Sequence, residues 1–280
     1  MEKSNNRFNL RYALPANSCN AHLHILDAVY LPEGKKPTRL GEITDYKEIA
    51  ERLHLQRAVF VQPKIYGTNH ECLLHAIQEF GEERSIGIAV VHGDVSDQEL
   101  VHLHESGVRG LRFSVWNPRN AVVSFNDCLP LSYRIKDMGW NMQLHMGAAQ
   151  LLEDADTIEK LPCKVVIDHM GRLNPALGTK DPAFAQICKW LDKGNFWVKL
   201  SGPYLNTKSG YPWEDAASVA RAFVSYAPER LVWGSDYPHL TEKENIPEEV
   251  FVKQIPEWME GESVQQKILV ENPQILYGFK

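Results

Sequence analysis

The sequence predicts a single (β/α)8 barrel, in which eight parallel strands alternate with helices. Eight short apolar and β-branched runs, bounded by turn residues, follow one another at fairly even spacing. Segments with the apolar spacing of helices lie between these runs. Most of the runs are apolar on both faces, which is typical of parallel strands covered on both sides. The length of 280 residues is close to the usual size of such a barrel.

The runs predict the strands in chain order. They are Cys19–Leu26, Arg57–Gln62, Ser85–Val91, Val108–Val115, Asn141–Met146, Lys164–His169, Phe196–Ser201 and Leu231–Asp236. Helical spacing is clear in Asp45–Leu53, Glu71–Phe80, Ser96–Ser106, Pro182–Asp192 and Trp213–Tyr226. Residue pairs that suit a helix N-terminus stand at three of these starts, namely Thr44-Asp45, Ser96-Asp97 and Asp181-Pro182.

An open, doubly wound sheet is the alternative architecture, and it would carry a glycine-rich phosphate turn after its first strand. The first strand instead ends in HLHILD, with no G-x-G-x-x-G nearby. No linker or internal repeat divides the chain, so we expect one domain over residues 1–280. Residues 1–17 form a lead-in, and residues 247–280 are expected to hold helices that close the barrel.

Composition excludes several classes of protein. The 30 Lys and Arg against 36 Asp and Glu give a net charge of −6, which argues against a general nucleic-acid binder. Five scattered cysteines without a C-x-x-C pair predict neither a disulfide framework nor a thiolate zinc site. No apolar signal region or membrane-length run is present. We therefore expect a cytoplasmic protein with a small-molecule substrate and no membrane partner, and a homo-oligomer stays open.

Polar residues at the ends of the predicted strands mark the site, because active sites of (β/α)8 barrels lie at the carboxyl ends of their strands. His22 and His24 are two residues apart on one strand, so their side chains point to the same face. With His145 and Asp236 they form a set that suits one divalent metal, with zinc and manganese favoured, and metal-free operation is kept as the alternative.

A second H-x-H pair shows that the element matters more than the spacing. His102 and His104 fall in a predicted helix, where imidazoles two residues apart diverge around the axis by about 200°. We expect that pair on the surface. On strand four, Arg109 and Arg112 are three residues apart and therefore face opposite ways, and we expect Arg112 to enter the barrel mouth.

Two further roles follow from the same set of strand-end residues. Asp236, beside a metal, can act as a ligand, as the base for an attacking water, or as both. His169 is placed to polarise a substrate carbonyl.

Five sequence motifs of this chain resemble those of the amidohydrolase superfamily. The motifs are the H-x-H of strand one, QLHMG around His145, DHMGR from Asp168, KLSG from Lys199 and WGSDYPH from Trp233. They are most similar to the branch that contains 2-pyrone-4,6-dicarboxylate lactonase, D-galactarolactone isomerase, sugar-acid lactonases and sulfomuconolactone hydrolase. The resemblance extends from about residue 17 to 278.

The resemblance implies a distorted barrel that opens the ring of a small anionic lactone. Asp236 would activate water, while His22, His24 and His169 would bind or polarise the carbonyl. Arg112 and Arg172 match arginines that hold substrate carboxylates, for which their planar guanidinium groups are suited. The predicted substrate-binding residues are Arg112, Arg172, Tyr204 and His239.

Two departures from the pyrone-dicarboxylate lactonase affect these expectations. That enzyme has a further arginine after strand seven, where this chain offers Tyr204, Asn206 and Lys208, so the dicarboxylate pyrone is not the first choice of substrate. That metal-independent enzyme also lacks a histidine on strand five. His145 makes this set similar to the metal-binding members of the superfamily. Lactone isomerisation or metal-dependent decarboxylation is the alternative on the same site, and a catalytically silent binding barrel is the third hypothesis.

Overall fold

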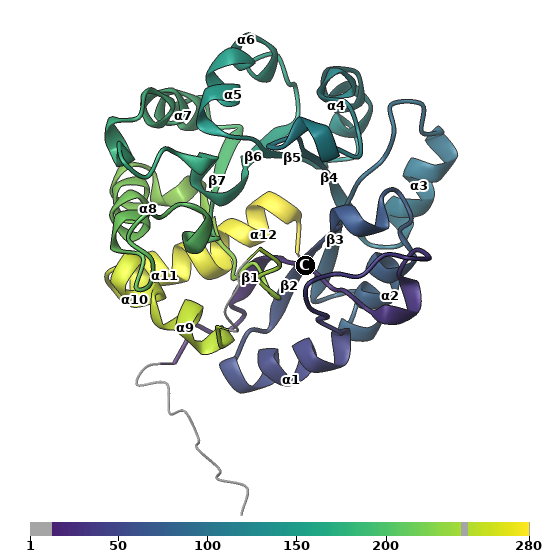
Figure 1. Ribbon diagram of the computed structural model, residues 1–280, viewed down its shortest axis with the longest axis horizontal. Coiled ribbons are helices and arrows are strands. Elements are labelled where there is room, and N and C mark those ends of the chain that lie inside the picture. The colour runs from purple at the N-terminus through teal and green to yellow at the C-terminus, as the bar shows by residue number, and fades with distance from the viewer. Residues whose placement is uncertain (1–12, 242–245, 280) are drawn as a thin grey trace, which may run out of the picture.

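Eight parallel strands pair in chain order from β1 to β8 in the computed structural model, which describes residues 13–241 and 246–279 (Figure 1). The strands are β1 Cys19–Leu23, β2 Arg57–Val61, β3 Ser85–Ala89, β4 Val108–Ser114, β5 Asn141–His145, β6 Lys164–Ile167, β7 Phe196–Leu200 and β8 Leu231–Trp233. Each lies inside one predicted run, so the predicted strand order and the barrel architecture are confirmed. The strands end earlier than the runs, because residues near His24 and Asp236 leave the sheet to build loops.

The barrel closes where the carboxyl end of β1 meets the chain after β8. Asp236 N donates to His22 O over 2.9 Å, and His24 N donates to Tyr237 O over 2.7 Å. A parallel bridge joins Leu23 to Tyr237. These bonds place His22, His24 and Asp236 at one seam of the barrel.

Helices lie outside the strands (Figure 1). They are α1 Ile43–Leu53, α2 Glu71–Phe80, α3 Asp97–Glu105, α4 Cys128–Lys136, α5 Ala148–Glu153, α6 Ala155–Ile158, α7 Pro182–Asp192 and α8 Glu214–Tyr226. Ser96 and Asp181 accept hydrogen bonds from the backbone of the first turns of α3 and α7, as predicted. The predicted cap at Thr44-Asp45 is wrong, because α1 begins at Ile43 and its N-cap Glu42 makes no side-chain cap.

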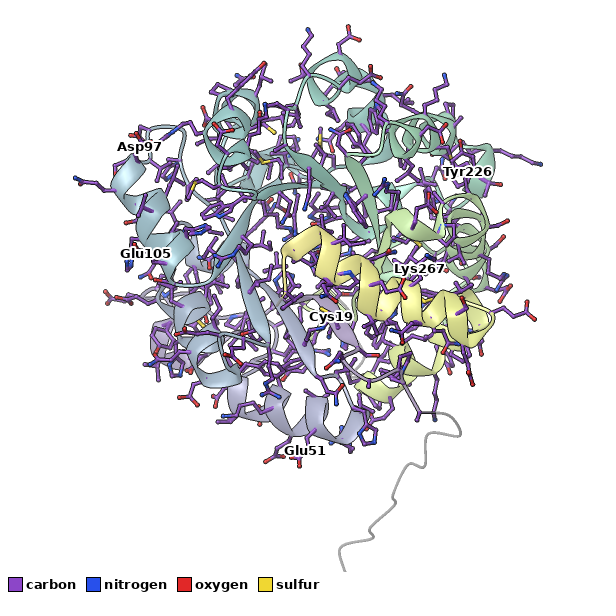
Figure 2. All side chains as sticks on the ribbon, turned by 180° about the vertical axis from the view of Figure 1, so that it is seen from behind. Cys19, Glu51, Asp97, Glu105, Tyr226 and Lys267 are labelled. Atoms are coloured by element: carbon purple, nitrogen blue, oxygen red, sulfur yellow. The ribbon has the colours of Figure 1, made fainter. Side chains whose placement is uncertain are left out.

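The C-terminal helices are α9 Glu248–Lys253, α10 Ile255–Trp258, α11 Glu262–Gln266, the π-helix η9 Lys267–Glu271 and α12 Asn272–Tyr277. Of these, η9 and α12 contact the amino ends of the strands, whereas Phe251 of α9 stacks on His239. Seen from behind, α12 crosses the barrel end at which Cys19 begins β1 (Figure 2). Three strand starts bond to this segment: Arg57 donates to Val270 O, Lys164 to Ile275 O, and Leu231 O accepts from Asn272. The described part of residues 247–280 is helical, as expected, and its closing role stays a prediction.

The barrel interior has an apolar layer and a polar layer. Near the amino ends, an apolar cluster from six strands packs against the C-terminal segment; it includes Cys19, Val59, Ile86, Val166, Trp197, Val232, Leu276, Tyr277 and Phe279. Toward the carboxyl ends the inward side chains become polar and charged, with Gln143, Asp168 and Lys199 fully buried. Since buried charges need partners, this polar layer is where chemistry is expected.

The five cysteines are all free and buried. Across residues 13–241 and 246–279, no helix combines the length and the apolar character that a bilayer crossing needs.

Gly234 shows how tightly the seam is packed. A Cβ atom at this position would lie 2.5 Å from His22 Cβ and 2.6 Å from His22 N. We expect Gly234→Ala to lower the free energy of unfolding by about 2 kcal/mol or more, because the backbone of β1 must move. Urea unfolding measures the change. In Gly147→Ala, the matched control, the new Cβ meets Trp116 Cδ1 at 3.3 Å, and Trp116 is exposed enough to shift. Equal losses in the two variants would contradict this account of the seam.

Candidate active site

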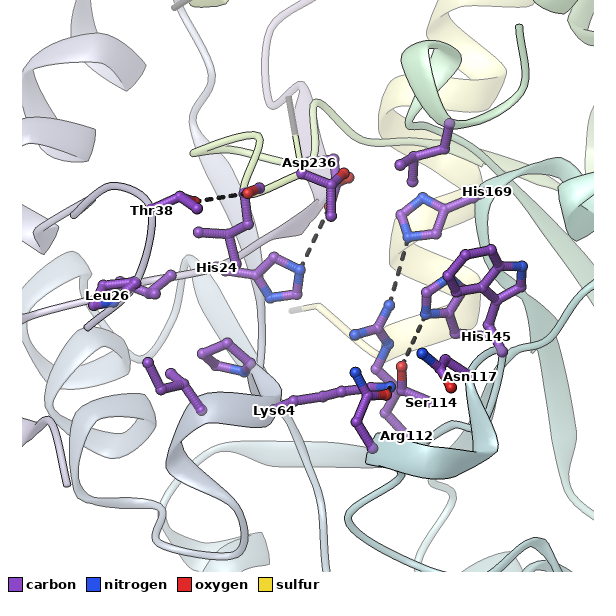
Figure 3. Close-up of a pocket in the computed structure, with 18 of the residues that line it drawn as sticks. His24, Leu26, Thr38, Lys64, Arg112, Ser114, Asn117, His145, His169 and Asp236 are labelled. Atoms are coloured by element: carbon purple, nitrogen blue, oxygen red, sulfur yellow. Dashed lines mark hydrogen bonds and ion pairs between the residues drawn. The ribbon is translucent and has the colours of Figure 1, made fainter. Parts of the chain in front are cut away.

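A cavity of about 510 Å³ opens at the carboxyl ends of the strands (Figure 3). This size suits a small-molecule substrate. The strand-end polar residues that line it are His24, Arg112, His145, His169, Arg172, Tyr204 and Asp236. His22 does not line the cavity and is fully buried behind His24 and Asp236.

Asp236 is the centre of the site. Its Oδ1 lies 3.4 Å from the Nε2 atoms of both His22 and His24, so the two imidazoles converge as the strand spacing predicts. Its Oδ2 accepts a hydrogen bond from Tyr204 Oη at 2.5 Å. Asp236 has a left-handed φ of 65°, which costs energy for a non-glycine residue and is typical of functional sites.

Lys199 is a fully buried cation in the floor of the site, and the sequence analysis did not assign it a role. Its Nζ donates to His22 Nδ1 at 2.8 Å and to Gln143 Oε1 at 2.5 Å. It also pairs with Asp168 Oδ1 at 3.2 Å. Asp168 Oδ2 accepts from Arg112 Nε at 2.8 Å. Lys199, Asp168 and Arg112 therefore form one buried charge cluster across β7, β6 and β4.

The pKa values in this cluster follow from burial opposed by opposite charge. Burial alone would raise the pKa of Asp168, but Lys199 and Arg112 hold it well below its usual range. Burial lowers the pKa of Lys199 to about 8, against the opposing effect of Asp168. Lys199 is therefore an ammonium at neutral pH that donates to His22 and Gln143 and pairs with the Asp168 carboxylate.

The charge cluster sets the tautomer of His22. Because Lys199 donates to His22 Nδ1, that nitrogen carries the lone pair and the proton lies on Nε2. Burial, followed by the charge of Lys199, holds the pKa of His22 well below its usual value, so the ring is neutral. Its Nε2–H group has no hydrogen-bond partner and faces Asp236. His22 thus presents a donor, not a lone pair, to the site.

The other two imidazoles of this centre are oriented by neutral partners. His24 Nδ1 donates to Val61 O at 2.7 Å, which leaves Nε2 facing Asp236. His169 Nδ1 bonds Ser201 Oγ at 2.9 Å, and its Nε2 faces Arg112 Nη2 at 3.5 Å. Burial lowers the pKa of His169 to about 4, so this ring is neutral at pH 7.

Burial of Asp236 alone would raise the pKa of its carboxyl group. The surrounding imidazoles outweigh that effect, with His169 the strongest, and hold the pKa well below its usual value. Asp236 is therefore a carboxylate throughout the neutral range.

His145 lies to one side of this centre. Its Nδ1 bonds Ser114 Oγ at 2.8 Å, its ring stacks on Trp116, and its edge meets the ring of His169 (Figure 3). Burial, followed by the charge of Arg112, holds the pKa of His145 well below its usual value. Its Nε2 is buried without a partner.

The predicted metal ligands are only partly brought together. Among the described residues, His22, His24 and Asp236 form one group whose potential ligand atoms lie within 4.8 Å of one another, and His22, Asp168 and His169 form another. His145 belongs to neither. A metal needs a lone pair from His22 Nε2, where the bond from Lys199 places a proton, and Asp168 is already held by Lys199 and Arg112. The hydrogen-bonded arrangement of these residues therefore does not fit a metal ion.

The DHMGR motif forms a turn, η5 Asp168–Arg172, that delivers three polar side chains to the site. His169, Met170, Gly171 and Arg172 all have a left-handed φ between 48° and 72°. Gly202 allows this turn to approach β7, because a Cβ there would lie 2.9 Å from His169 Nδ1. Arg172 stacks on the Trp116 ring, with its Cζ 4.3 Å from the ring centroid.

The structure locates the remaining predicted residues. Arg112 is buried and faces the cavity, while Arg109 points away and donates to His104 O, so the predicted orientations are confirmed. His239 lies outside this cavity. Its Nε2 is 3.2 Å from the buried Glu248 carboxylate and its ring stacks on Phe251, so it does not contact the space where we predicted it to bind substrate.

The predicted surface position of the second H-x-H pair holds for one of its two histidines. His102 is exposed, but His104 accepts a hydrogen bond from Trp140 Nε1 at 2.8 Å and stacks on that ring. The surface prediction for His104 is therefore wrong. The spacing of the pair in α3 does send the two rings in different directions.

One sequence signal could have identified Lys199. Trp197, Lys199 and Ser201 are two residues apart, so the strand alternation places all three on the inner face of the barrel. A lysine on that face is buried and must have a carboxylate partner. Asp168 directly follows the neighbouring strand β6, which makes it the nearest choice.

Comparisons with known proteins identify the family of this chain. A family model described as amidohydrolase matches residues 19–279. The chain is 30% identical over 281 residues to a 2-pyrone-4,6-dicarboxylate hydrolase of Comamonas testosteroni, covering 95% of this chain and 92% of that protein. It is 28% identical to a 4-sulfomuconolactone hydrolase of Rhizobium radiobacter, with 96% and 92% covered. It is 24% identical to a D-galactarolactone isomerase of Agrobacterium fabrum, with 95% and 92% covered.

A solved structure shows the same fold. The crystal structure of a probable 2-pyrone-4,6-dicarboxylic acid hydrolase from Acinetobacter baumannii, with citric acid bound, superimposes with a TM-score of 0.82. The two chains are 27% identical, and the match covers 94% of this chain and 100% of the other.

The neutral, buried His169 predicts an acid-sensitive fold. Its pKa is about 4 in the folded chain and about 6.5 when unfolded, so between these values only the unfolded chain binds the proton. The free energy of unfolding should therefore fall as the pH drops from 6.5 to 4, with about 3 kcal/mol of the loss due to His169. Urea unfolding at pH 7 and pH 4.5 measures this dependence.

His169→Asn should show a shallower pH dependence than the wild type, whatever its absolute stability. His54→Asn, at an exposed histidine, is the control and should keep the wild-type slope. An unchanged slope in His169→Asn would show that His169 is not the source of the dependence.

Proposed function

Because the chain belongs to the amidohydrolase family, we propose that it hydrolyses a small anionic lactone with a water molecule activated by Asp236. The observation that carries the proposal is the position of Asp236. One carboxylate, ionised and aligned by Tyr204, faces a cavity beside the donor groups of Arg112. Ester hydrolysis needs a base for water and donors for the developing oxyanion, and this site has both.

The first step forms a bond between the oxygen of water and the lactone carbonyl carbon. Asp236 Oδ1 takes the proton of that water as the oxygen attacks. The Nε2–H group of His22 faces the same carboxylate oxygen and keeps the carboxylate turned toward the cavity. Tyr204 holds Oδ2, which leaves Oδ1 as the oxygen that acts as base.

The carbonyl oxygen becomes an oxyanion in this step. Arg112 and His169 both line the cavity, and Arg112 is a permanent cation anchored by Asp168. Its remaining N–H groups need not reorganise during the reaction, which is the condition under which a preorganised donor stabilises a transition state most. We assign oxyanion stabilisation to Arg112, because the Nε2 atoms of His24 and His169 carry lone pairs in this hydrogen-bonded arrangement.

The second step breaks the bond between the carbonyl carbon and the ring oxygen. The electron pair moves to the ring oxygen, which becomes an alkoxide or enolate as the carboxylic acid forms, and this acid loses the second proton of the attacking water to solvent. The proton held by Asp236 passes to that oxygen, so Asp236 returns to its starting state. No other proton donor is needed for the balance.

Arg172 is our proposed anchor for the acidic group of the substrate. It lines the cavity, stacks on Trp116 and has a fixed orientation. A guanidinium group can hold a carboxylate with two parallel hydrogen bonds. The related Acinetobacter baumannii structure contains citric acid, which supports an anionic ligand in this type of barrel.

We propose that the reaction does not require a metal, because Lys199 places the proton of His22 on Nε2. We predicted a zinc or manganese ion from the strand-end residues. If bound, it would be held by His22, His24 and Asp236 and would polarise the carbonyl as a Lewis acid. It would need Lys199 to release His22 Nδ1 so that the imidazole proton could move. His145, the fourth predicted ligand, would then remain bonded to Ser114.

Isomerisation of a lactone is the second candidate, favoured by the 24% identity to a D-galactarolactone isomerase. The same carboxylate and oxyanion donors could transfer the acyl group between two substrate hydroxyls without water. We also propose a reducing, cytoplasmic location, which the five free and buried cysteines support.

Asp236→Asn tests the assignment of the base. The amide cannot take a proton from water, so kcat for a lactone substrate should fall by about a thousandfold, while KM changes little. A panel of sugar-acid lactones and muconolactones, followed with a pH indicator, supplies the assay. Asp156→Asn is the matched surface control and should keep wild-type turnover. Near-normal turnover in Asp236→Asn would overturn the assignment.

Reaction in heavy-oxygen water separates the two candidate functions. Hydrolysis places the heavy oxygen in the new carboxylate of the product, and isomerisation leaves the product unlabelled. Mass spectrometry of the product reads the outcome directly.

Metal removal tests the proposed independence from metal. Prolonged treatment with a chelator should leave kcat/KM within about twofold of the untreated protein, because His22 presents a proton and not a lone pair. Elemental analysis of the same samples measures zinc and manganese. Stoichiometric metal together with loss of turnover on its removal, restored by adding the metal, would show that the predicted metal centre forms.

A further inference from the structure

The cavity at the carboxyl ends of the strands has two walls of different chemistry. The polar wall comes from β4, β5 and the turn after β6, and it includes Arg112, His145 and His169. The apolar wall comes from the loops after β1, β2 and β8, and it consists of Leu26, Pro37, Pro63, Ile65 and Leu240.

The order of the strands places the two walls opposite each other. β8, β1 and β2 are neighbours in the barrel, and β4 to β6 lie across from them. Figure 3 shows Leu26 on one side of the cavity and His145 on the other, with His24 and Asp236 between them. A substrate whose carbonyl group meets Asp236 therefore has the polar wall on one side and the apolar wall on the other.

Hydrogen bonds between the three loops hold the apolar wall in place. Tyr66 Oη donates to Asp27 O at 2.9 Å and accepts from Asp27 N at 2.8 Å, which joins the loops after β2 and β1. Thr38 Oγ1 donates to Leu240 O at 2.8 Å, which joins the loops after β1 and β8. These bonds occupy polar groups of the loops with one another, and the wall that the loops present to the cavity is apolar.

Two lysines of the same loops direct their charge away from this wall. Lys64 Nζ donates to Asn120 Oδ1 at 2.9 Å, and Asn120 belongs to the loop after β4. Figure 3 shows the Lys64 side chain extended toward Arg112, on the polar side of the cavity. Lys36 is exposed, so its ammonium group is hydrated.

The apolar wall has surface left for a ligand, because Pro37, Ile65 and Leu240 are only partly buried. A cavity of about 510 Å³ can enclose a ligand of drug size, so a bare lactone ring with one acid group fills only part of it. Each methylene group that a ligand buries here should strengthen binding by about fourfold. A hydroxyl group at the same place would lose water without gaining a partner, which weakens binding.

We propose that the substrate is a lactone with an apolar substituent on the side of its ring that lies away from its acid group. This inference rests on the proposed function, in which Arg172 holds the acid group and Asp236 faces the carbonyl carbon. The chemical class is a lactone that bears one acid group and an alkyl, alkenyl or aryl substituent. Polyhydroxylated sugar-acid lactones are poorer substrates, because their hydroxyl groups would face Ile65 and Leu240.

Calorimetric titration with a matched pair of acids tests the proposal without turnover. Hexanoate and gluconate have the same number of carbons and one carboxylate each, but gluconate carries a hydroxyl group on every other carbon. We expect the wild type to bind hexanoate at least tenfold more tightly than gluconate. Binding should also strengthen by about threefold to fourfold for each methylene group added between butyrate and hexanoate.

Two variants of the apolar wall make the result specific. Leu240→Asn keeps the branching of the side chain and adds a polar amide, and Ile65→Thr does the same with a hydroxyl group in the short helix η2 Lys64–Tyr66. Each should lower the ratio of hexanoate to gluconate affinity by at least threefold. Gluconate affinity should be retained, which shows that the site of the variant is folded. Leu177→Asn, at an exposed leucine outside this cavity, is the matched control and should keep the wild-type ratio.

Three results would overturn the proposal. The first is gluconate binding as tight as hexanoate binding in the wild type. The second is an unchanged ratio in both Leu240→Asn and Ile65→Thr. The third is an equal loss in Leu177→Asn, which would show that the effect does not come from the apolar wall.

Failure here is distinguishable from failure of the proposed function. The titrations use acids that are not turned over, whereas the lactonase assignment depends on Asp236→Asn and on heavy-oxygen incorporation. A protein that hydrolyses lactones but binds gluconate as tightly as hexanoate would keep the lactonase function and lose the preference for an apolar substituent.

Discussion

The ion cluster of Lys199, Asp168 and Arg112 is the interaction on which the rest of the site depends. All three charges are buried, and each has its opposite within 3.2 Å. Removal of one member would leave an uncompensated charge inside the barrel, which costs about 3 to 5 kcal/mol in proteins. The cluster joins strands β4, β6 and β7 and so holds the carboxyl end of the barrel in one arrangement.

The cluster also determines what the imidazoles can do. The bond from Lys199 to His22 places a proton on the nitrogen that faces Asp236. The hydrogen bond that Arg112 donates to Asp168 fixes a guanidinium group at the cavity wall. The same residues could hold a metal if the protons were distributed differently, since three of them converge closely enough. The hydrogen bonds behind the site, and not the identity of its residues, therefore decide between metal-free and metal-dependent catalysis.

The two ends of the barrel have separate tasks. Apolar side chains from the amino ends pack against α12, and this layer stabilises the fold but takes no part in the reaction. At the other end, Asp236 and the turn from His169 to Arg172 adopt left-handed conformations. A well-packed lower half can support such strain, which is why functional residues of these barrels sit on loops held by a rigid scaffold.

The sequence by itself determined the strands, their parallel order and the convergence of His22 and His24, because these depend on local periodicity. Helices α2 and α7 were predicted to their last residues for the same reason. Tertiary structure alone decided that His239 turns toward Glu248, that His104 packs on Trp140 and that Lys199 donates to His22 Nδ1. These outcomes depend on residues up to 177 positions apart in the chain. Side-chain spacing predicts the face on which a residue lies. The hydrogen-bond partner of an imidazole, which decides which of its nitrogens carries the proton, is fixed only when strands distant in the sequence pack together.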